Sequence, residues 1–198
     1  MVFWQCRFMF DVVFPEGNEN EFIRIAQVLG LEGLVFVYSS KADFFSESAP
    51  IAIKNALYIK PEQIHRARSL GALAVCPASR EAIERGADVV FGFELSSRDD
   101  KTHYRKSGLN QVLCRLASRK GVKIGFSFRS ILDSPNQRRA VVLGRMAQNA
   151  LLCEKFEAPI AFASFAKRPS GMRSSSDMAS VMRLLGFSEK SIRQGLGF

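Results

Sequence analysis

The sequence predicts an α/β barrel of about seven parallel strands. Short apolar runs rich in β-branched and aromatic residues recur along the chain, and helical patterns separate nearly all of them. No repeat, low-complexity tract or linker interrupts this alternation. Because a closed or nearly closed barrel removes sheet edges, we expect one TIM-barrel-like domain over residues 1–198, with an open doubly wound sheet as the alternative.

Four strands are expected in the first half, at Phe8–Phe14, Gly33–Tyr38, Asn55–Lys60 and Ala72–Cys76. After the first of them, Asn18 or Asn20 can cap a helix that ends at Gly30. Pro61 stands where a short second helix begins, and a third is expected near residues 78–85. The continuous apolar run of the second strand is typical of a strand covered on both faces.

Three more strands are expected later in the chain, at Ala87–Phe93, Lys123–Phe128 and Ala158–Ser164. Two longer helices separate them, at Ser107–Lys120 with Ser107 as its cap and at Asn136–Phe156. Two further helices close the chain, near Ser174–Leu185 and Ser188–Gln194. The apolar stripe expected on the longest helix consists of Ala140, Leu143, Ala147, Ala150 and Leu151.

Positive charge is concentrated in the second half of the chain. The whole sequence carries a net charge of +9. Residues 1–99 hold 10 Lys and Arg against 13 Asp and Glu, whereas residues 100–198 hold 18 against 6. A one-sided basic field favours a polyanionic partner, most often a nucleic acid, although a merely soluble basic protein remains the alternative.

Basic residues recur in the loops that leave the expected strands, where α/β barrels place their functional sites. In the first half these are Lys41, Lys60 and Arg80, and the acidic balance there is typical of ordinary solvated loops. In the second half they are Arg105, Arg129, Lys167 and Arg168. Few acidic residues are available to pair with the second group, so we interpret it as functional.

The longest helix carries a second basic signal. Arg138, Arg145 and Asn149 are spaced by seven and four residues and therefore share one helix face. Such a stripe can follow a phosphate backbone, but a solvated helix face is an equally good explanation of the spacing. His103, in a polar loop, could hydrogen-bond a phosphate or a carboxylate, and we expect it to order that loop.

The sequence offers no recognisable catalytic or metal-binding motif. It has only two histidines, no Gly-rich phosphate loop and no Gly-x-Ser-x-Gly nucleophile elbow. None of the four cysteines, Cys6, Cys76, Cys114 and Cys153, forms a Cys-x-x-Cys pair, which favours buried free thiols in a reducing cytoplasm. No signal peptide or membrane span is expected, and we expect no metal and no cofactor.

Two long segments of the chain stand out as a specific pattern, KSGLNQVLCRLASRKGVKIGFSFRSIL (Lys106–Leu132) and RRAVVLGRMAQNALLCEKFEAPIAFASFA (Arg138–Ala166). Both resemble the ribonuclease P protein component 3 family, the archaeal and eukaryotic p30-type subunit. VVFGFE (Val89–Glu94), MRSSSDMASVMRLLGF (Met172–Phe187) and, less specifically, residues 11–38 are also similar to that family. The resemblance implies an archaeal-type subunit with a barrel related to those of polymerase-and-histidinol-phosphatase phosphoesterases.

The resemblance also implies a non-catalytic role in a ribonucleoprotein that removes 5′ leaders from precursor tRNA, with cleavage carried out by the RNA. The implied partners are ribonuclease P RNA, ribonuclease P protein component 2, other protein subunits and, indirectly, precursor tRNA. The alternatives are a metal-dependent phosphoesterase, which the shortage of histidines disfavours, and a protein scaffold. The residues expected to contact RNA are Lys41, His103, Arg105, Arg129, Arg138, Arg145, Lys167, Arg168 and Arg173.

Overall fold

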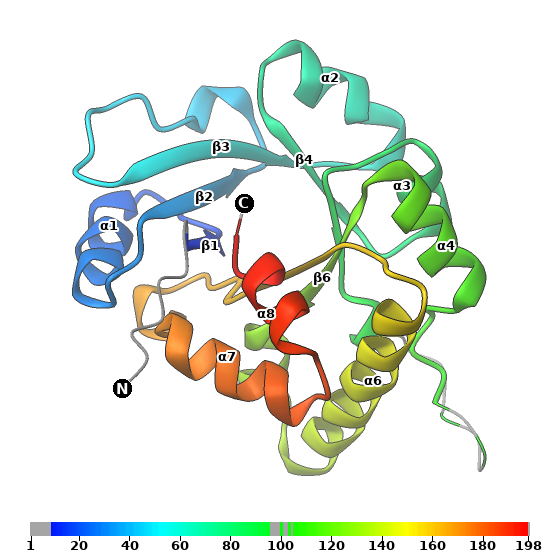
Figure 1. Ribbon diagram of the computed structural model, residues 1–198. Helices are drawn as coiled ribbons and strands as arrows, with labels where there is room; N and C mark the ends of the chain where they lie inside the picture. The colour runs from blue at the N-terminus through cyan, green and yellow to red at the C-terminus, as the bar shows by residue number, and fades with distance from the viewer. Residues whose placement is uncertain (1–8, 96–99, 101–102, 104, 198) are drawn as a thin grey trace.

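The chain forms a barrel of seven parallel strands, in which each strand pairs with the next one along the sequence (Figure 1). The computed structural model describes residues 9–95, 100, 103 and 105–197. The strands are β1 (Phe10–Val13), β2 (Gly33–Tyr38), β3 (Ala52–Tyr58), β4 (Leu73–Pro77), β5 (Val89–Phe91), β6 (Lys123–Ser127) and β7 (Ile160–Ala163). All seven expected strands are present; Phe8 and Cys6 lie outside the described residues.

The barrel is nearly closed between β1 and β7. Val13 and Ala166 form an isolated parallel bridge, and the amide of Phe14 donates to the carbonyl of Ala166 at 2.8 Å. Next to this bridge, Oδ1 of Asp11 accepts a hydrogen bond from the amide of Ser164 at 2.6 Å. These contacts replace a full ladder at the seam. The predicted TIM-barrel-like fold is therefore confirmed, and an open sheet is excluded.

Helices cover most of the outer surface of the barrel (Figure 1). They are α1 (Glu19–Val28), α2 (Ile64–Ser69), α3 (Arg80–Glu84), α4 (Gln111–Lys120), α5 (Phe128–Leu132), α6 (Asn136–Lys155), α7 (Ser175–Leu184) and α8 (Glu189–Gly195). The short helix α5 was not expected from the sequence. In the described parts of the chain, no helix has the length and apolar character needed to cross a bilayer.

Helix α4 begins four residues later than predicted. Its cap is Asn110, whose Oδ1 accepts from the amides of Val112 and Leu113, both at 3.0 Å. The predicted cap, Ser107, is buried and its hydroxyl donates to Oδ1 of Asn149 at 2.6 Å. Ser107 therefore ties the preceding loop to α6, and the prediction failed because the tertiary partner of this serine is distant in sequence.

The inside of the barrel and the layer between strands and helices form separate cores. The inner core contains small and branched side chains, among them Val12, Val35, Val75, Val89 and Ala161. Phe165 lies at one end of this inner core and stacks on Phe91, with ring centroids 4.4 Å apart. The barrel interior is therefore filled with side chains, which confines any ligand to its ends.

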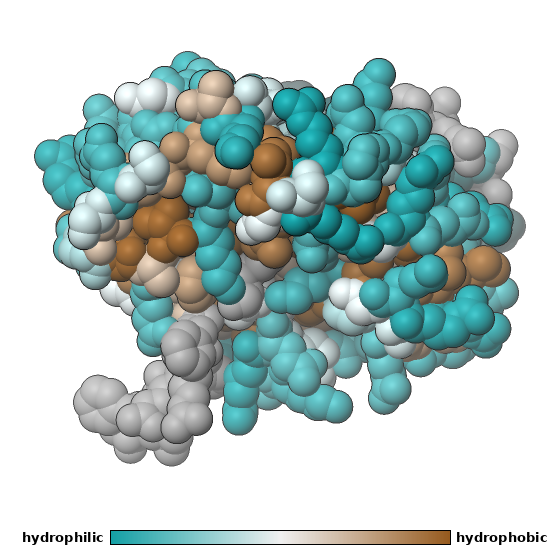
Figure 2. Space-filling view, turned by 90° about the horizontal axis from the view of Figure 1, so that it is seen from above, coloured by the Kyte–Doolittle hydropathy of each residue, from teal (hydrophilic) through white to brown (hydrophobic). Residues whose placement is uncertain are grey.

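The connection between β2 and β3 contains no α-helix. It contains only the 3-10 turn η1 (Lys41–Asp43), and Phe45 from this loop packs edge-on against Phe36 with centroids 5.6 Å apart. The first four residues of β3 are exposed or half-buried, unlike those of β2. In the space-filling view from above, hydrophobic patches lie among hydrophilic side chains on this face of the molecule (Figure 2).

The C-terminal segment closes the amino end of the barrel. Helix α8 lies in front of the barrel centre in Figure 1, and the carbonyl of Leu196 accepts from the amide of Phe10 at 3.3 Å. Nζ of Lys123, at the start of β6, donates to the carbonyl of Gly197 at 3.0 Å. A site formed by the strand ends is therefore accessible from the opposite, carboxyl end.

Candidate nucleic-acid interface

The carboxyl ends of the strands surround a cavity of about 840 Å³, which we call the barrel mouth. The rings of Phe14, Tyr58 and Phe91 line it, from β1, β3 and β5 respectively or directly after them. Arg129 and Lys167 also line it, and they follow β6 and β7. The barrel mouth therefore combines aromatic surface with cationic groups at the end of the barrel where α/β barrels place their sites.

Four predicted residues gather beside the mouth, at the ends of β6 and β7, and we call them the basic corner: Arg129, Arg138, Lys167 and Arg168. Arg129 is the common member. It shares a hollow of about 470 Å³ with Lys167 and Arg168, and another of about 330 Å³ with Arg138. The amide of Arg129 donates to the carbonyl of Ser164 at 3.0 Å, which fixes α5 against the end of β7.

Acidic partners reach two members of the basic corner. Nε of Arg129 lies 2.7 Å from a carboxylate oxygen of Asp133, and Nζ of Lys167 lies 3.8 Å from one of Glu16. The expectation that few acids pair with these bases is therefore wrong for this pair of residues. Both ion pairs are solvent-exposed, so each is worth roughly 0–1 kcal/mol and a phosphate can replace the carboxylate. Arg138 and Arg168 are exposed and make no ion pair within the described residues.

The guanidinium of Arg173 is partly occupied by hydrogen bonds to the loop that carries it. Its guanidinium donates to the carbonyls of Ser170 and Met172 at 3.0 and 2.7 Å. It also lies over the ring of Phe128, 5.3 Å from the centroid. Through Phe128, which starts α5, Arg173 supports the segment that carries Arg129.

Lys41 and His103 are exposed, and neither lines the hollows of the basic corner. Lys41 belongs to η1, after β2, and β2 is separated from β6 by β1 and β7. His103 lies in the connection between β5 and α4, most of whose neighbouring residues are outside the described part. The structure therefore separates Lys41 from Arg129 by two strands, and it shows no contact between His103 and Arg129 within the described residues.

Arg145 and Asn149 lie on the buried face of α6, contrary to the predicted exposed stripe. Arg145 is 5% exposed and Asn149 is 1% exposed, whereas Arg138 is exposed. The expected apolar stripe was wrong at Ala140 and Leu151, which are exposed, whereas Ala150 is buried and Leu143 and Ala147 pack against the core. The helix is rotated so that these polar side chains bind the loop after β5, and Arg145 is consequently inaccessible to a phosphate.

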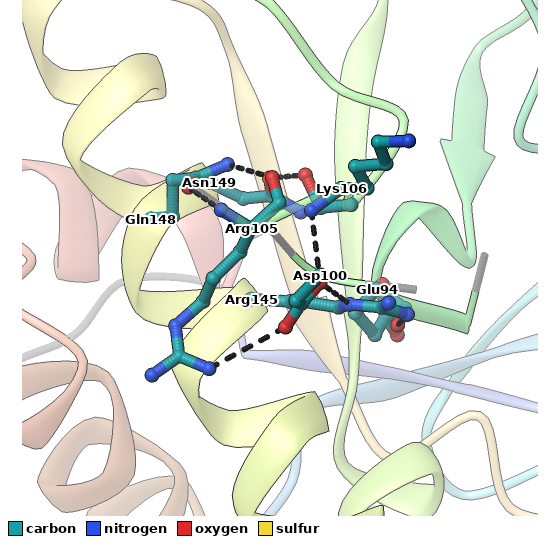
Figure 3. A network of polar contacts seen from close by, with 8 residues as sticks. Glu94, Asp100, Arg105, Lys106, Arg145, Gln148 and Asn149 are labelled. Atoms are coloured by element: carbon teal, nitrogen blue, oxygen red, sulfur yellow. Dashed lines mark hydrogen bonds and ion pairs between the residues drawn. The ribbon is translucent and has the colours of Figure 1, made fainter. Parts of the chain in front are cut away.

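Asp100 organises that loop (Figure 3). Its Oδ1 accepts from Nε of Arg145 and from the amide of Lys106, both at 2.9 Å. Oδ2 lies 3.5 Å from Nη1 of Arg105, whose backbone is held at both its N–H and its carbonyl by Gln148. Burial alone would raise the pKa of Asp100, but the hydrogen bonds from Lys106 and Arg145 outweigh it and lower that pKa. The side chain of Arg105 is exposed and lies over Gly144 on α6.

Two buried carboxylic acids were not identified from the sequence. Asp11 is 3% exposed at the β1–β7 seam, and Glu94 is 1% exposed after β5. Burial raises the pKa of Asp11 to about 6 despite its hydrogen bonds with Ser164 and Val12, and raises the pKa of Glu94 to about 7. The available signal was a single acid inside or next to an apolar run, FDVVF and VVFGFE.

Comparison with known proteins places these features in context. Residues 96–197 match the family model described as RNase P subunit p30. A protein of Methanosarcina mazei named ribonuclease P protein component 3 is 36% identical over 85 residues, which cover 43% of this chain and 33% of the relative. A protein of the same name from Methanosarcina acetivorans is 34% identical over 85 residues, 43% of this chain and 36% of the relative. The chain therefore matches about a third of the length of these relatives.

Two further matches extend over most of the chain. A protein of Natronomonas pharaonis, also named ribonuclease P protein component 3, is 27% identical over 191 residues, 92% of this chain and 81% of the relative. A chain in a solved structure described as archaeal ribonuclease P with mature tRNA superimposes with a TM-score of 0.73 at 20% identity, covering 92% of this chain and 85% of that one. This structural likeness establishes the same barrel fold.

Proposed function

Because the chain belongs to the RNase P subunit p30 family, we propose that it acts as a protein subunit of ribonuclease P. In this role it binds the RNA of the complex and supports removal of 5′ leaders from precursor tRNA, while the RNA performs the cleavage. The name shared by its relatives, one of them similar over 92% of this chain, supports the proposal.

The basic corner is the observation that carries the RNA-binding part of this proposal. Arg129, Arg138, Lys167 and Arg168 come from the carboxyl ends of two adjacent strands and the start of α6, and they surround connected hollows. Arg and Lys at such a surface neutralise phosphates and release counterions. Because A-form RNA hides its bases in a deep major groove, we expect recognition by backbone shape.

The proposed partners follow from the family and not from an observed contact. They are ribonuclease P RNA, ribonuclease P protein component 2 and the other protein subunits, with precursor tRNA reached indirectly. Arg105 and Arg173 are retained as secondary RNA contacts because both are accessible in part. Lys41 and His103 are exposed and are further candidates for RNA contacts. Arg145 is buried, so it is not proposed as an RNA contact.

Reconstitution tests the proposed function directly. Precursor-tRNA cleavage is measured with the RNA and all protein subunits, and again with this protein alone omitted. We expect omission to lower the cleavage rate and re-addition to restore it. An unchanged rate on omission would refute the role, and hydrolysis of a simple phosphodiester by the isolated protein would favour the phosphoesterase alternative.

A pair of matched variants tests the assignment of the basic corner. Arg129→Ala removes an arginine that is paired with an acid four residues away at 2.7 Å, and Arg85→Ala removes one paired at 2.8 Å with Glu81 at the other end of α3. We expect Arg129→Ala to weaken RNA binding and Arg85→Ala to leave it unchanged. Equal affinities for the two variants would refute the location of the interface.

A further inference from the structure

The barrel mouth has an aromatic floor that is only partly covered. The rings of Phe14, Tyr58 and Phe91 form a triangle with centroid separations of 5.9 Å, 6.1 Å and 6.0 Å. Tyr58 is 40% exposed, and the other two rings are half-buried. The three rings are inclined to one another by 47° to 79° and remain partly open to the mouth. Each nucleobase has a flat π face that can stack on one of them.

Rigid packing holds this floor in place from below. Phe91 stacks on Phe165, with their planes only 17° apart, and Phe165 is 1% exposed. Gly125 on β6 makes room for the pair, because a Cβ there would lie 2.5 Å from Cβ of Phe91 and 3.3 Å from Cζ of Phe165. The floor is therefore preorganised, and a ligand that stacks on it needs little rearrangement of the protein.

The walls of the mouth differ in charge. Arg129 and Lys167 stand on the side of β6 and β7, whereas Glu16, Glu19 and Asp43 stand on the side of β1 and β2. Lys167 reaches only 3.8 Å from Glu16, so its ammonium group is weakly paired. The basic wall suits a phosphate, and the acidic wall suits hydrogen-bond donors such as the amino groups of a base or ribose hydroxyls.

We propose that the barrel mouth binds a single unpaired nucleotide of RNA, with its base on the aromatic floor and its phosphate between Arg129 and Lys167. The cavity volume of about 840 Å³ is within the range of small-molecule pockets and accommodates a nucleotide. The mouth is continuous with the basic corner through Arg129 and Lys167, so the flanking backbone runs over the corner. This inference rests on the proposed function and adds a specific binding site to it.

Affinity measurements on the reconstituted complex test the base-stacking step. Tyr58→Ala removes an exposed ring from the floor, and Phe156→Ala removes a half-buried ring near the amino end of β7. We expect Tyr58→Ala to weaken binding of the RNA roughly tenfold, Tyr58→Phe to recover most of the loss, and Phe156→Ala to have no effect. If Tyr58→Ala does not fold, Tyr58→Leu serves instead, because it preserves apolar volume without a ring.

Ultraviolet crosslinking of the unaltered complex provides a readout that needs no variant. Trypsin releases Tyr58 in the peptide Asn55–Arg66, since the Lys60–Pro61 bond resists cleavage. We expect this peptide to carry a crosslinked nucleotide in mass spectra and expect free mononucleotides not to displace the RNA. A crosslink confined to peptides of the basic corner, together with unchanged affinity of Tyr58→Ala, would refute the inference.

The two proposals fail in distinguishable ways. If omission of the protein leaves precursor-tRNA cleavage unchanged, the proposed function is wrong. If omission slows cleavage but Tyr58→Ala binds RNA like the unaltered protein, only the nucleotide site is wrong. Tyr58-dependent binding of mononucleotides without any effect on RNA affinity would also overturn the assignment, because the mouth would then serve a free nucleotide.

Discussion

Identical residue types on one helix have different roles in this protein. Arg138 and Arg145 both lie on α6, seven residues apart. Arg138 is exposed beside Arg129, whereas Arg145 is buried against Asp100 and the carbonyl of Glu94. The sequence alone presents them as equivalent members of one basic stripe. Burial separates a residue that can meet a phosphate from one that holds the loop after β5.

Arg145→Ala is expected to destabilise the protein by about 1–3 kcal/mol, because it removes a buried guanidinium that donates to Asp100 and to the carbonyl of Glu94. Arg138→Ala, on the exposed face of the same helix, is expected to change stability by less than about 0.5 kcal/mol. Urea denaturation of both variants measures the difference. Similar losses for the two variants would contradict the burial of Arg145.

Asp11 makes stability depend on pH at the barrel seam. Its pKa is raised from 3.8 to about 6 by burial, so the folded state retains a proton that the unfolded state has already lost between these values. The contribution of Asp11 to stability therefore falls as pH rises from 4 to 6, by about 2 kcal/mol, and is constant above that range. Asp11→Asn cannot titrate and should lack this part of the decline. Denaturation curves of both proteins at pH 4 and pH 7 measure the difference, and parallel pH profiles would rule out the effect.

Two glycines of the barrel, one on β6 and one on α6, differ in whether a larger residue can replace them. Gly125 on β6 faces the inner core, and a Cβ there would lie 2.5 Å from Cβ of Phe91. Gly144 on α6 lies under Arg105, and a Cβ there would lie 2.3 Å from Cζ of that side chain. The first neighbour is locked in an aromatic stack, whereas the second is the end of a flexible, exposed side chain. Strand β6 therefore requires glycine and helix α6 does not.

Gly125→Ala is expected to destabilise the protein by about 1–3 kcal/mol through overpacking of the barrel interior. Gly144→Ala is expected to be neutral or to stabilise it by up to about 1 kcal/mol, since alanine favours the helix and Arg105 can swing away. Thermal unfolding of the two variants tests this contrast. A large loss for Gly144→Ala would indicate that the position of Arg105 matters for folding.

At the scale of the whole molecule, the fold converts a charge asymmetry along the sequence into a local cluster. The basic corner gathers at the ends of two adjacent strands, although its members are spread over residues 129–168. Other bases of the second half are taken up elsewhere, as Arg183 is by Glu189 at 2.6 Å. The net charge therefore overstates the number of basic side chains that a polyanion can reach.

RNA affinity is expected to fall steeply with salt, and Arg168→Ala should reduce the slope of log affinity against log salt by about 1. Arg168 is exposed at the basic corner, so its loss removes about one phosphate contact. Arg85→Ala, at the far end of α3, should not change the slope. Titrations at several salt concentrations provide the measurement, and equal slopes for all three proteins would contradict the role of the basic corner.

Local patterns were sufficient for the fold but only partly for the site. The β-type runs and the intervening helices predicted all seven strands, because each run is bounded by strong turn and cap residues. The long basic segments that resemble the p30-type family also lie within the matched residues 96–197. The rotation of α6 was missed because its buried face contains Arg145 and Asn149, whose partners, Asp100 and Ser107, lie far away in sequence.

Local sequence patterns predicted the seven strands, the helices between most of them and the loops that carry the bases, because apolar periodicity and turn residues act over a few neighbouring positions. They favoured a barrel but left an open sheet as the alternative. Which bases are accessible depends on contacts between segments that are distant in sequence, such as those between α6 and the loop after β5. The same is true of the three rings from β1, β3 and β5, which meet at one end of the barrel. Such a meeting depends on the closure of the sheet, which no local pattern records.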